Sequence, residues 1–387
     1  MTLPRSLMLN ALFLQPGASG GVDTYLRGLA PALLRAAPEI SLSVATTRLG
    51  ADALRSEGWD DWCEIVEFPC DDGQRVRRQT AEQVFLPREA RRRRVQILHS
   101  LASLGPMWTP RLRHVVTLHD VTFFHEATFG RVTTTGMRTV MRGAAGDADA
   151  ALTGTATAGE DISEVLGLDP EMLLVAHHGF NRAPARAAIG SAELRLRYGL
   201  GDDRLLLCVA AKRPHKNQAL LVRSLQDLPE DVRLVLVGHP EPYDLELRKL
   251  AEAEGVAGRT TFLEYVPDEE LEGLWAAASC AAFPTRNEGF GIPVIEAMDR
   301  RVPVACSDIP VLREIGGAVP RFFPIDEPAA CATAIRDALD GEDRREAGHA
   351  WAAQFTWDAS ATVHLEAYER AMARPADVGR AHALDAG

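Results

Sequence analysis

The sequence predicts an α/β protein made of two doubly wound parallel-sheet domains, and three observations support this fold class. The chain has 387 residues, too many for one ordinary hydrophobic core, so two domains of similar size are expected. Short apolar runs alternate with amphipathic helical stretches in both halves, as in parallel sheets wrapped by helices. Each half also contains an apolar run, a glycine-bearing loop and a helix start, within residues 7–36 and 280–298.

The junction in the second half has the features of a phosphate seat. Cys280–Phe283 predicts a buried strand, and Pro293 suits the first turn of the helix that follows. The unpaired N–H groups at a helix start attract an anion, and Gly289 and Gly291 let a ligand approach the backbone closely. The loop and helix start therefore predict a bound phosphate.

Two carboxylates flank this phosphate seat. Glu288 lies in the loop and Glu296 about one turn into the helix. Carboxylates accept hydrogen bonds and so suit hydroxyl groups, which makes the whole arrangement fit a sugar nucleotide. For either glutamate alone, a solvated loop position or a complement to the helix N-terminus is the plain alternative.

Residues 288–298 read EGFGIPVIEAM, which resembles the signature of the retaining, GT-B-fold glycosyltransferases of family GT4, the glycosyl transferases group 1. The resemblance implies that Glu288 meets the hydroxyls of the donor sugar and Glu296 holds the ribose. It also implies that the backbone at Gly289, Phe290, Gly291 and Ile292 meets the sugar and the diphosphate.

The junction in the first half combines a strand at Leu7–Leu14 with a glycine turn and a helix at Thr24–Ala36. Gly20 and Gly21 fall at the helix entrance, where amides can meet a phosphate, although a purely structural turn is an equal alternative. The resemblance implies that Gly21 reaches the donor phosphate. The pattern is not Gly-x-Gly-x-x-Gly, so the dehydrogenase-type dinucleotide fingerprint is absent.

His119 and Asp120 directly follow the apolar run Val115–Leu118. Ligands of parallel sheets bind beyond the carboxyl ends of the strands, which is where this pair is expected. The resemblance implies that His119 contacts the donor sugar near the reacting carbon, with Asp120 as its orienting or acceptor-side partner. His177 and His178 are neighbours on an extended segment and point to opposite sides, so they do not predict a shared metal ion.

Two of the three lysines in the chain, Lys212 and Lys216, lie in the loop after the apolar run Leu205–Ala210. A lysine where a loop enters a helix is a point charge for a phosphate, although a basic surface turn is the alternative. The resembling family usually carries an Arg five residues before the Lys-Asn pair, where this chain has Ala211. Lys216 is therefore expected to neutralise the leaving diphosphate, with Lys212 or Arg213 supplying the second charge.

The resemblance also extends to the base and to the domain layout. It implies that the nucleotide base lies against the backbone near Tyr265 and Val266. The predicted division is an acceptor-side domain at 1–183, a linker at 184–201 and a nucleotide-sugar domain at 202–357. A helix at 358–374 is expected to cross back to the first domain, before a flexible tail at 375–387.

Composition excludes several other classes. The net charge of −12 argues against non-specific nucleic-acid binding. The six cysteines are scattered without metal-site spacing and predict reduced core residues of a cytoplasmic protein. No apolar run is long enough to span a membrane. The basic cluster of Arg88 and Arg91–Arg94 has no apolar face beside it in the sequence, so it is interpreted as a solvated helix end, and membrane association is left open but not expected.

Together these features predict a retaining glycosyltransferase that moves a hexosyl-type sugar from a nucleoside-diphosphate donor to an acceptor hydroxyl. Neither a cofactor nor a metal is expected. The nearly neutral first half favours a small soluble acceptor such as an aminocyclitol. The alternatives are a lipid-carrier or polysaccharide glycosyltransferase, a non-catalytic sugar-nucleotide-binding protein, and a GT-B epimerase. The sequence gives no indication of the oligomeric state.

Overall fold

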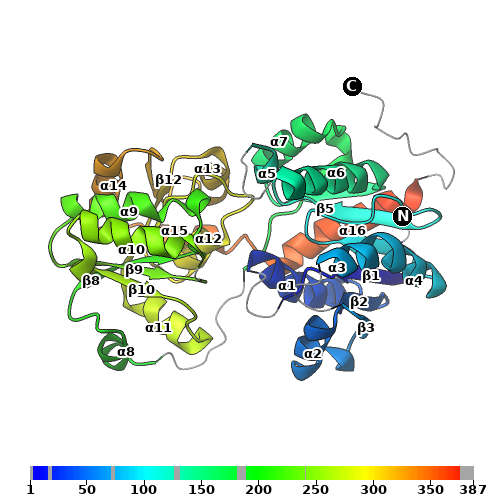
Figure 1. The fold of residues 1–387 in the computed structure, drawn as a ribbon, viewed down its shortest axis with the longest axis horizontal. Coiled ribbons are helices and arrows are strands. Elements are labelled where there is room, and N and C mark those ends of the chain that lie inside the picture. Colours follow the sequence, from blue (N-terminus) through cyan, green and yellow to red (C-terminus); the bar gives the residue numbers. More distant parts are fainter. Residues whose placement is uncertain are drawn as a thin grey trace. The chain divides into compact units, whose positions relative to one another are not determined.

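The structure is a computed structural model that describes residues 3–15, 20–70, 75–125, 131–180, 189–239 and 241–374. The chain divides into two compact units (Figure 1). Unit 1 comprises Met1–Gly179 and Thr356–Gly387, and unit 2 comprises Phe180–Phe355. The chain therefore leaves unit 1 after Gly179 and returns to it after Phe355.

The described part of unit 1 contains a seven-stranded parallel sheet in the order β3-β2-β1-β4-β5-β6-β7. Alternate residues of β1 face opposite layers, because Leu7 and Leu9 belong to the core under α1 whereas Met8 packs against Leu86 and Ala90. The strands are β1 (Ser6–Ala11), β2 (Ser41–Thr47), β3 (Glu64–Phe68), β4 (Ile97–Ser100), β5 (Arg113–Thr117), β6 (Ala150–Thr153) and β7 (Leu173–Val175).

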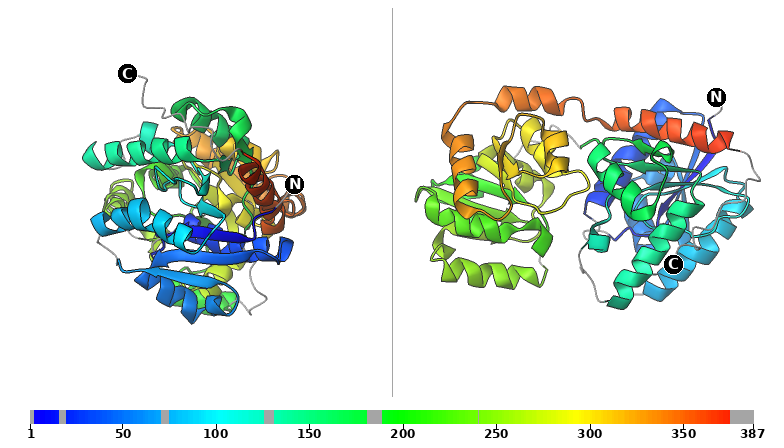
Figure 2. Two further views of the ribbon diagram at one scale, coloured as in Figure 1. Left: turned by 90° about the vertical axis from the view of Figure 1, so that its right-hand side faces the viewer. Right: turned by 90° about the horizontal axis from the view of Figure 1, so that it is seen from above.

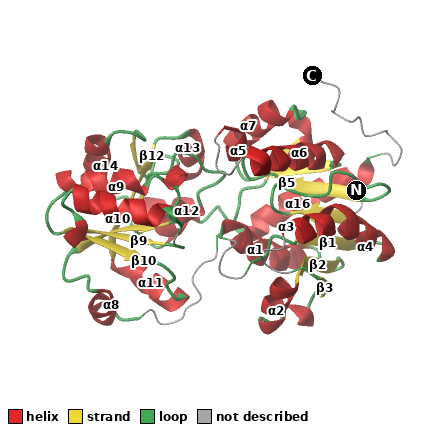
Figure 3. Cartoon of the chain, in the orientation of Figure 1, coloured by secondary structure: helices red, strands yellow, loops and turns green. Residues whose placement is uncertain are grey.

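Helices cover both faces of this sheet (Figure 3). One face packs against α1, α2 and α16, and the other against η2, α4, α6 and α7. The helical elements are α1 (Gly21–Ala36), α2 (Arg48–Ser56), η1 (Trp59–Asp61), α3 (Arg75–Thr80), η2 (the π-helical turn Ala81–Phe85), α4 (Leu86–Arg92), α5 (Thr122–His125), α6 (Arg131–Asp147), α7 (Ala156–Leu166), η3 (Pro170–Met172) and α16 (Trp357–Ala373).

The helix α16 belongs to unit 1 although it lies at the other end of the chain. It packs along α1 (Figures 1 and 2), and it contributes Trp357, Ala361 and Tyr368 to the core of this unit. Gly28 of α1 lies directly beneath Trp357, where a Cβ atom would clash with the indole ring. The absence of a side chain at Gly28 therefore lets the two helices approach closely.

The described part of unit 2 contains six parallel strands in the order β10-β9-β8-β11-β12-β13. Leu205 and Leu207 of β8 face one core layer, and Leu206 and Cys208 face the other. The strands are β8 (Arg204–Val209), β9 (Val232–Val237), β10 (Thr260–Leu263), β11 (Ala278–Phe283), β12 (Val304–Ser307) and β13 (Arg321–Phe323).

The helices of unit 2 also enclose its sheet. The layer with Leu205 packs against α8, α11, α12, α13 and α15, and the layer with Leu206 packs against α9, α10 and α14. The helical elements are α8 (Ser191–Tyr198), η4 (Pro214–Lys216), α9 (Gln218–Ser224), η5 (Leu225–Asp227), α10 (Tyr243–Ala253), η6 (Ala257–Arg259), α11 (Asp268–Ala277), α12 (Ile292–Asp299), α13 (Pro310–Gly316), α14 (Pro328–Asp340) and α15 (Arg345–Ala352).

The predicted fold class, two doubly wound parallel-sheet domains, is confirmed. The predicted linker 184–201 contains α8, whose Leu194 is buried in the core of unit 2, while 184–188 and the predicted tail 375–387 lie outside the described residues. All six cysteines are buried and free of disulfides. Among the described residues, no helix is both long enough and apolar enough to cross a membrane.

Candidate functional site

The strand order of unit 2 places two loops at its topological switch point. The chain runs from β8 outward to β9 and β10, and β11 then pairs on the opposite side of β8. The carboxyl ends of β8 and β11 are therefore adjacent strand ends where the winding direction reverses, the usual ligand position in open parallel sheets. The loop 210–217 follows β8, and the loop 284–291 follows β11.

These two loops are hydrogen-bonded to each other. The backbone N–H of Arg286 donates to the carbonyl of His215 at 2.8 Å, and the Arg286 guanidinium donates to Asn217 Oδ1 at 3.3 Å. Asn217 is almost fully buried in a left-handed conformation (φ 54°), and its amide donates to Ile325 O at 2.8 Å. The bracing holds the end of each loop in a fixed position.

Lys216 and Glu288 meet across these loops. Lys216 Nζ donates to Glu288 Oε1 at 2.5 Å, and both side chains remain partly exposed to solvent. A cation and an acceptor carboxylate thus lie side by side at the switch point. This pair can offer a positive charge to a phosphate and a hydrogen-bond acceptor to a hydroxyl.

The helix α12 begins directly beyond Glu288. Gly291 caps it with φ 95°, and a Cβ atom there would lie 2.7 Å from Leu312 Cδ2, so this position requires glycine. The Phe290 ring is buried and packs edge-on against Phe355, with 5.9 Å between ring centroids. The side chain of Phe290 is therefore a core group, and only its backbone can serve a ligand.

Glu296 lies one turn into α12 and has no hydrogen-bond partner for its carboxylate among the described residues. The neighbouring Arg300 is engaged by Glu272, to which its guanidinium donates at 2.5 and 3.0 Å. Burial raises the pKa of Glu296 to about 7, with Arg300 acting in the opposite direction. A carboxylate that is desolvated and unpaired is ready to accept hydrogen bonds from a hydroxylated ligand.

In unit 1, His119 follows β5 and is held by both ring nitrogens. Nε2 lies 2.7 Å from Leu101 O, and Nδ1 lies 3.3 Å from His178 Nε2. A carbonyl only accepts, so Nε2 of His119 carries a proton and donates it to Leu101, which leaves Nδ1 as the acceptor from His178. Burial lowers the pKa of both histidines, which keeps them neutral in this arrangement.

Behind His119, hydrogen bonds of fixed direction join the sheet to α16. His364 Nδ1 lies 2.7 Å from the carbonyl of Ser360 and must donate to it, so His364 Nε2 accepts from Tyr25 OH at 2.6 Å. The Tyr25 hydroxyl lies 3.0 Å from Thr117 Oγ1. Its ring stands edge-on to His119, with 5.1 Å between ring centroids. These fully buried groups fix the surroundings of His119 without any charge.

His99 extends the same network. Its Nε2 lies 2.8 Å from Thr117 Oγ1, and its Nδ1 lies 2.8 Å from the hydroxyl of Tyr368 on α16. Burial places the pKa of His99 well below its usual value and lowers that of His364 to about 4. His99 and His364 are therefore neutral at physiological pH and hold α16 to the rest of unit 1.

Two family models match the chain, one in each unit. The model described as glycosyl transferases group 1 matches residues 192–352, and the model described as glycosyltransferase family 4 matches residues 19–183. The two matches together span most of both units. The chain belongs to glycosyltransferase family 4.

The chain is similar in sequence to named glycosyltransferases. It is 34% identical over 181 residues to O-antigen chain mannosyltransferase B of Escherichia coli, covering 45% of this chain and 48% of that protein. It is 30% identical over 240 residues to the D-inositol 3-phosphate glycosyltransferase of Mycobacteroides abscessus, covering 59% and 53%. The chain thus spans about half the length of these relatives.

Solved structures share the fold across nearly the whole chain. A glycosyltransferase from Rickettsia africae superposes with a TM-score of 0.72 at 14% identity, covering 96% of this chain and 100% of that one. Anabaena HepE, solved in complex with UDP and glucose, gives 0.68 at 18% identity, covering 95% and 97%. At these identities the likeness establishes the GT-B fold and nothing finer.

The side chain of Lys212 does not lie where it could bind a phosphate. It is fully buried, and its ammonium donates to Gly238 O at 2.7 Å and Leu263 O at 2.8 Å, with Asp244 Oδ1 3.5 Å away. Burial lowers the pKa of Lys212, and Asp244 opposes that shift. Two carbonyls and the nearby carboxylate thus surround the ammonium, so Lys212 joins the ends of β9 and β10 instead.

The other expected residues differ in their surroundings. Asp120 does not orient the ring of His119, because its Oδ1 accepts from the N–H of Thr122 at 2.9 Å and so caps α5. Arg213 donates twice to Glu241, at 2.8 and 3.1 Å. Tyr265 is 80% exposed whereas Val266 is buried, so only the backbone of Val266 is available to a base.

Gly21 and Ile292 lie at helix starts. Gly21 is the first residue of α1, with open space where a Cβ atom would stand, and Ile292 is the first residue of α12. Their amides belong to the N-terminal turns, whose N–H groups lack intrahelical partners. The glycine turn before α1 is only partly visible, because residues 16–19 lie outside the described part of the chain.

Sequence reasoning missed two residues of these sites. Arg286, which hydrogen-bonds to Asn217, stands next to the signature in the sequence, and its charge could have indicated it. His178, which holds His119 Nδ1, was considered only as a metal ligand. Its contact joins positions 59 apart in the sequence, so only the three-dimensional fold reveals it.

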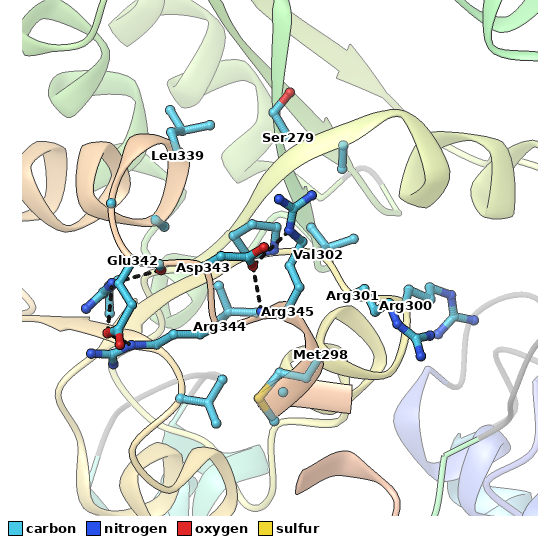
Figure 4. Close-up of a pocket in the computed structure, with 18 of the residues that line it drawn as sticks. Ser279, Met298, Arg300, Arg301, Val302, Leu339, Glu342, Asp343, Arg344 and Arg345 are labelled. Carbon is cyan, nitrogen blue, oxygen red and sulfur yellow. Dashed lines mark hydrogen bonds and ion pairs between the residues drawn. The ribbon is translucent and has the colours of Figure 1, made fainter. Parts of the chain in front are cut away.

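A cavity at the amino edge of the sheet of unit 2 is not part of this site. It has a volume of about 510 Å³ and is lined by residues at the starts of β11, β12 and β13, among them Ser279 and Val302 (Figure 4). These starts are opposite the carboxyl ends of the strands, whose loops carry Lys216 and Glu288. Its arginines are engaged by neighbouring groups, for example Arg344 by Glu342 and Arg345 by Asp343. The cavity wall is therefore a network of internal ion pairs.

Proposed function

We propose that the chain is a retaining glycosyltransferase that moves a hexosyl-type sugar from a nucleoside-diphosphate donor to an acceptor hydroxyl. The observation that carries this proposal is the Lys216–Glu288 pair at the switch point of unit 2, 2.5 Å apart and partly exposed. Family membership supports the same reaction class. The pair combines a cation that suits a phosphate with a carboxylate that suits hydroxyl groups.

In the proposed reaction, the bond between the anomeric carbon and the phosphate oxygen breaks, and the acceptor oxygen bonds to the same face of the sugar. The acceptor's proton passes to the departing phosphate oxygen. Lys216 would leave Glu288 for the diphosphate, and Glu288 would then accept from the sugar hydroxyls. Groups positioned in advance where charge develops are the largest single source of such stabilisation.

We propose Arg286 for the second positive charge, with Arg213 as the alternative. Arg286 donates to Asn217, which directly follows Lys216, and it also pairs with the exposed Asp326 at 2.6 Å. An exposed ion pair is worth little, so a diphosphate can displace Asp326 at small cost. The amides of Gly289, Gly291 and Ile292 would add the positive end of the α12 dipole.

The remaining donor contacts follow from the same geometry. We propose that Glu296 accepts from the ribose hydroxyls, that the backbone near Tyr265 and Val266 meets the base, and that Gly21 meets the phosphates. His119 would contact the donor sugar from unit 1. Because both ring nitrogens of His119 are engaged within that unit, this contact requires His178 to give up Nδ1 or the carbon edge of the ring to face the sugar.

The carrier of the acceptor hydroxyl has two candidates. The sequence favours a small soluble acceptor such as an aminocyclitol, because no apolar face accompanies the basic cluster at 88–94. In the structure, Phe85 and Trp108 are exposed on segments next to that cluster. This removes one of the two grounds for the first candidate, the other being the nearly neutral first half, and it makes a lipid-carried saccharide the second candidate.

A panel of nucleotide sugars tests the proposal. The donor should raise the melting temperature, since a ligand at 100 times its dissociation constant stabilises a protein by about 2.7 kcal/mol. Transfer to an acceptor with retained anomeric configuration would support a glycosyltransferase. Binding without transfer would indicate a non-catalytic binding protein, and a changed sugar in the absence of acceptor would indicate an epimerase.

A further inference from the structure

We propose that Tyr25 of α1 is a positioning residue for His119 and that α16, through His364, holds Tyr25 in place. The ring of Tyr25 contacts His119, and its hydroxyl is hydrogen-bonded to His364 on α16. The inference rests on the proposed function, in which His119 meets the donor sugar. It adds a helix from the other end of the chain to the groups that determine the rate of transfer.

The ring of Tyr25 contacts both members of the His119–His178 hydrogen bond. It stands edge-on to His119, with 5.1 Å between ring centroids, and is tilted against His178 at 4.7 Å. Aromatic rings in such contacts prefer a narrow set of mutual orientations. Tyr25 is fully buried, so its own position is fixed by protein atoms. A shift of the Tyr25 ring would therefore displace the pair that sets the orientation of His119.

Two hydrogen bonds hold the hydroxyl of Tyr25, and donor counting fixes their directions. His364 Nδ1 donates to the carbonyl of Ser360, so His364 Nε2 accepts the single proton of the Tyr25 hydroxyl at 2.6 Å. The oxygen of Tyr25 must then accept from the hydroxyl of Thr117, which lies 3.0 Å away. Tyr25 is thus held between α16 on one side and β5 on the other.

The same reasoning extends these hydrogen bonds to a second point on α16. The proton of Thr117 is used toward Tyr25, so Thr117 Oγ1 accepts from His99 Nε2 at 2.8 Å. Burial keeps the pKa of His99 well below its usual value, so the ring is neutral and its Nδ1 accepts from the Tyr368 hydroxyl at 2.8 Å. The hydrogen bonds therefore run in one direction, from Tyr368 of α16 through β4, β5 and α1 back to Ser360 of α16.

Such a one-directional series of hydrogen bonds acts as a unit. Each donor polarises the next one, and a buried partner that loses its hydrogen bond stays unsatisfied. The side chains of the series are at most 1% exposed, so water does not reach them to replace a lost partner. They are Tyr368, His99, Thr117, Tyr25 and His364.

The helix α16 also supports the pair of histidines through Trp357, its first residue. The indole is stacked on His178, with 6.2 Å between ring centroids and 19° between the planes, and lies 5.8 Å from the ring of Tyr25. Gly179 follows His178, and a Cβ atom at Gly179 would lie 2.3 Å from the backbone nitrogen of Trp357. The absence of a side chain at Gly179 therefore permits this stack.

Tyr25 and Tyr368 form a matched pair for a test. Each donates its hydroxyl proton to a buried histidine, but the ring of Tyr25 contacts His119 whereas that of Tyr368 stands edge-on to His99, 5.6 Å away. Tyr25→Phe and Tyr368→Phe should therefore lower the melting temperature by similar amounts. Nitrogen NMR shifts of His119, recorded without ligand, should move in Tyr25→Phe and stay at the wild-type values in Tyr368→Phe.

The rate of transfer separates the two variants further. The probe is whichever of UDP-glucose, UDP-N-acetylglucosamine and GDP-mannose raises the melting temperature, and kcat is followed by release of the nucleoside diphosphate. Tyr25→Phe should lower kcat about tenfold with an unchanged KM for that donor, because it moves His119 without removing it. Tyr368→Phe should keep the wild-type kcat. His364→Leu should behave like Tyr25→Phe, whereas His364→Gln, whose amide oxygen can accept from Tyr25, should stay closer to the wild type.

Unchanged His119 shifts in Tyr25→Phe, a wild-type kcat in that variant, or an equal fall of kcat in Tyr368→Phe would overturn the proposal. Equal kcat values for His364→Leu and His364→Gln would contradict the part assigned to α16. A His119→Ala variant tests the proposed function separately, since its kcat should fall at least as far as that of Tyr25→Phe. A wild-type kcat in His119→Ala would contradict the sugar contact proposed for His119, whatever the shifts in Tyr25→Phe show.

Discussion

The carboxyl edges of the two sheets use their titratable groups in opposite ways. In unit 2 the loops after β8 and β11 present an ion pair, Lys216 and Glu288, that is partly open to solvent. In unit 1 the buried histidines behind the strand ends are neutral, because burial lowers the pKa of His99, His119 and His178. A charged edge suits a diphosphate, whereas a neutral, hydrogen-bonded edge suits the sugar or an uncharged acceptor.

The largest effect is expected at the charged edge. Lys216→Met and Glu288→Gln should each lower kcat about 100- to 1,000-fold, because each removes a group positioned for the transition state. The melting temperature should change little, since the pair is partly exposed. Arg313→Met, which breaks an exposed ion pair with Asp308 elsewhere in unit 2, is the control. A wild-type kcat in either the Lys216 or the Glu288 variant would contradict the proposed donor site.

At the neutral edge, His178 is expected to act as a positioning residue for His119. His178→Phe removes the donor to His119 Nδ1 and should lower kcat about 10- to 100-fold, while the KM for the donor stays unchanged. His178→Gln, which retains an N–H donor, should recover much of that loss. Nitrogen NMR shifts of His119 should move in His178→Phe and not in His178→Gln. Identical kcat values for the two variants would show that the hydrogen bond has no role.

The charged edge should also respond to pH through Glu296, whose pKa burial raises to about 7. Ribose hydroxyls bind the ionised carboxylate, so donor affinity should rise about tenfold between pH 6 and pH 8. The same group affects stability in the opposite sense. Because its folded pKa is raised, its stabilising contribution is complete below about pH 4.5 and is lost as the pH passes through 7.

Glu296→Gln provides the matched test of both effects. The variant should bind donor weakly and without this pH dependence, and its melting temperature should exceed that of the wild type at pH 8. Titration calorimetry and thermal unfolding measure the two effects separately. A wild-type affinity that is flat from pH 6 to pH 8 would contradict the proposed contact.

The smallest expected effect on catalysis, and a large one on stability, belongs to Lys212. Lys212→Met removes the donor to Gly238 O and Leu263 O and the cation beside Asp244, which keeps only its pairing with Arg248, and this should cost about 3 kcal/mol. For a unit of this size the melting temperature should fall by about 10 °C. Lys249→Met, at an exposed lysine of α10, should leave it unchanged. A normal melting temperature together with a loss of donor binding would show that Lys212 binds the donor.

The sequence could predict the fold class and the motif loops because these depend on local patterns. Alternating apolar runs give the strands, and Gly291 with Pro293 gives the start of α12. It failed where a side chain's direction depends on distant backbone. Lys212 and Lys216 are four residues apart in one basic loop, yet one ends among the carbonyls of β9 and β10 and the other at Glu288.

The same limit applies in unit 1. The pairing of His119 with Asp120 looked convincing because the two are adjacent, but the acid caps α5 and the histidine is held by Leu101 and His178. The exposed side chains of Phe85 and Trp108 likewise come from segments more than twenty positions apart, which hydrogen bonds of Gln83 hold together. Neither arrangement has a period or spacing that a sequence pattern could carry.

The membership of α16 in unit 1 has a consequence for the order of events during synthesis. The ribosome makes the first 179 residues long before Trp357 and Tyr368, which complete their core. Unit 2 is continuous in sequence and can fold as soon as it emerges from the ribosome. The part of unit 1 that precedes it still has an uncovered apolar face at that time. Unit 2 should therefore complete its fold before unit 1, and chaperones should hold the first segment of unit 1 until α16 has been synthesised.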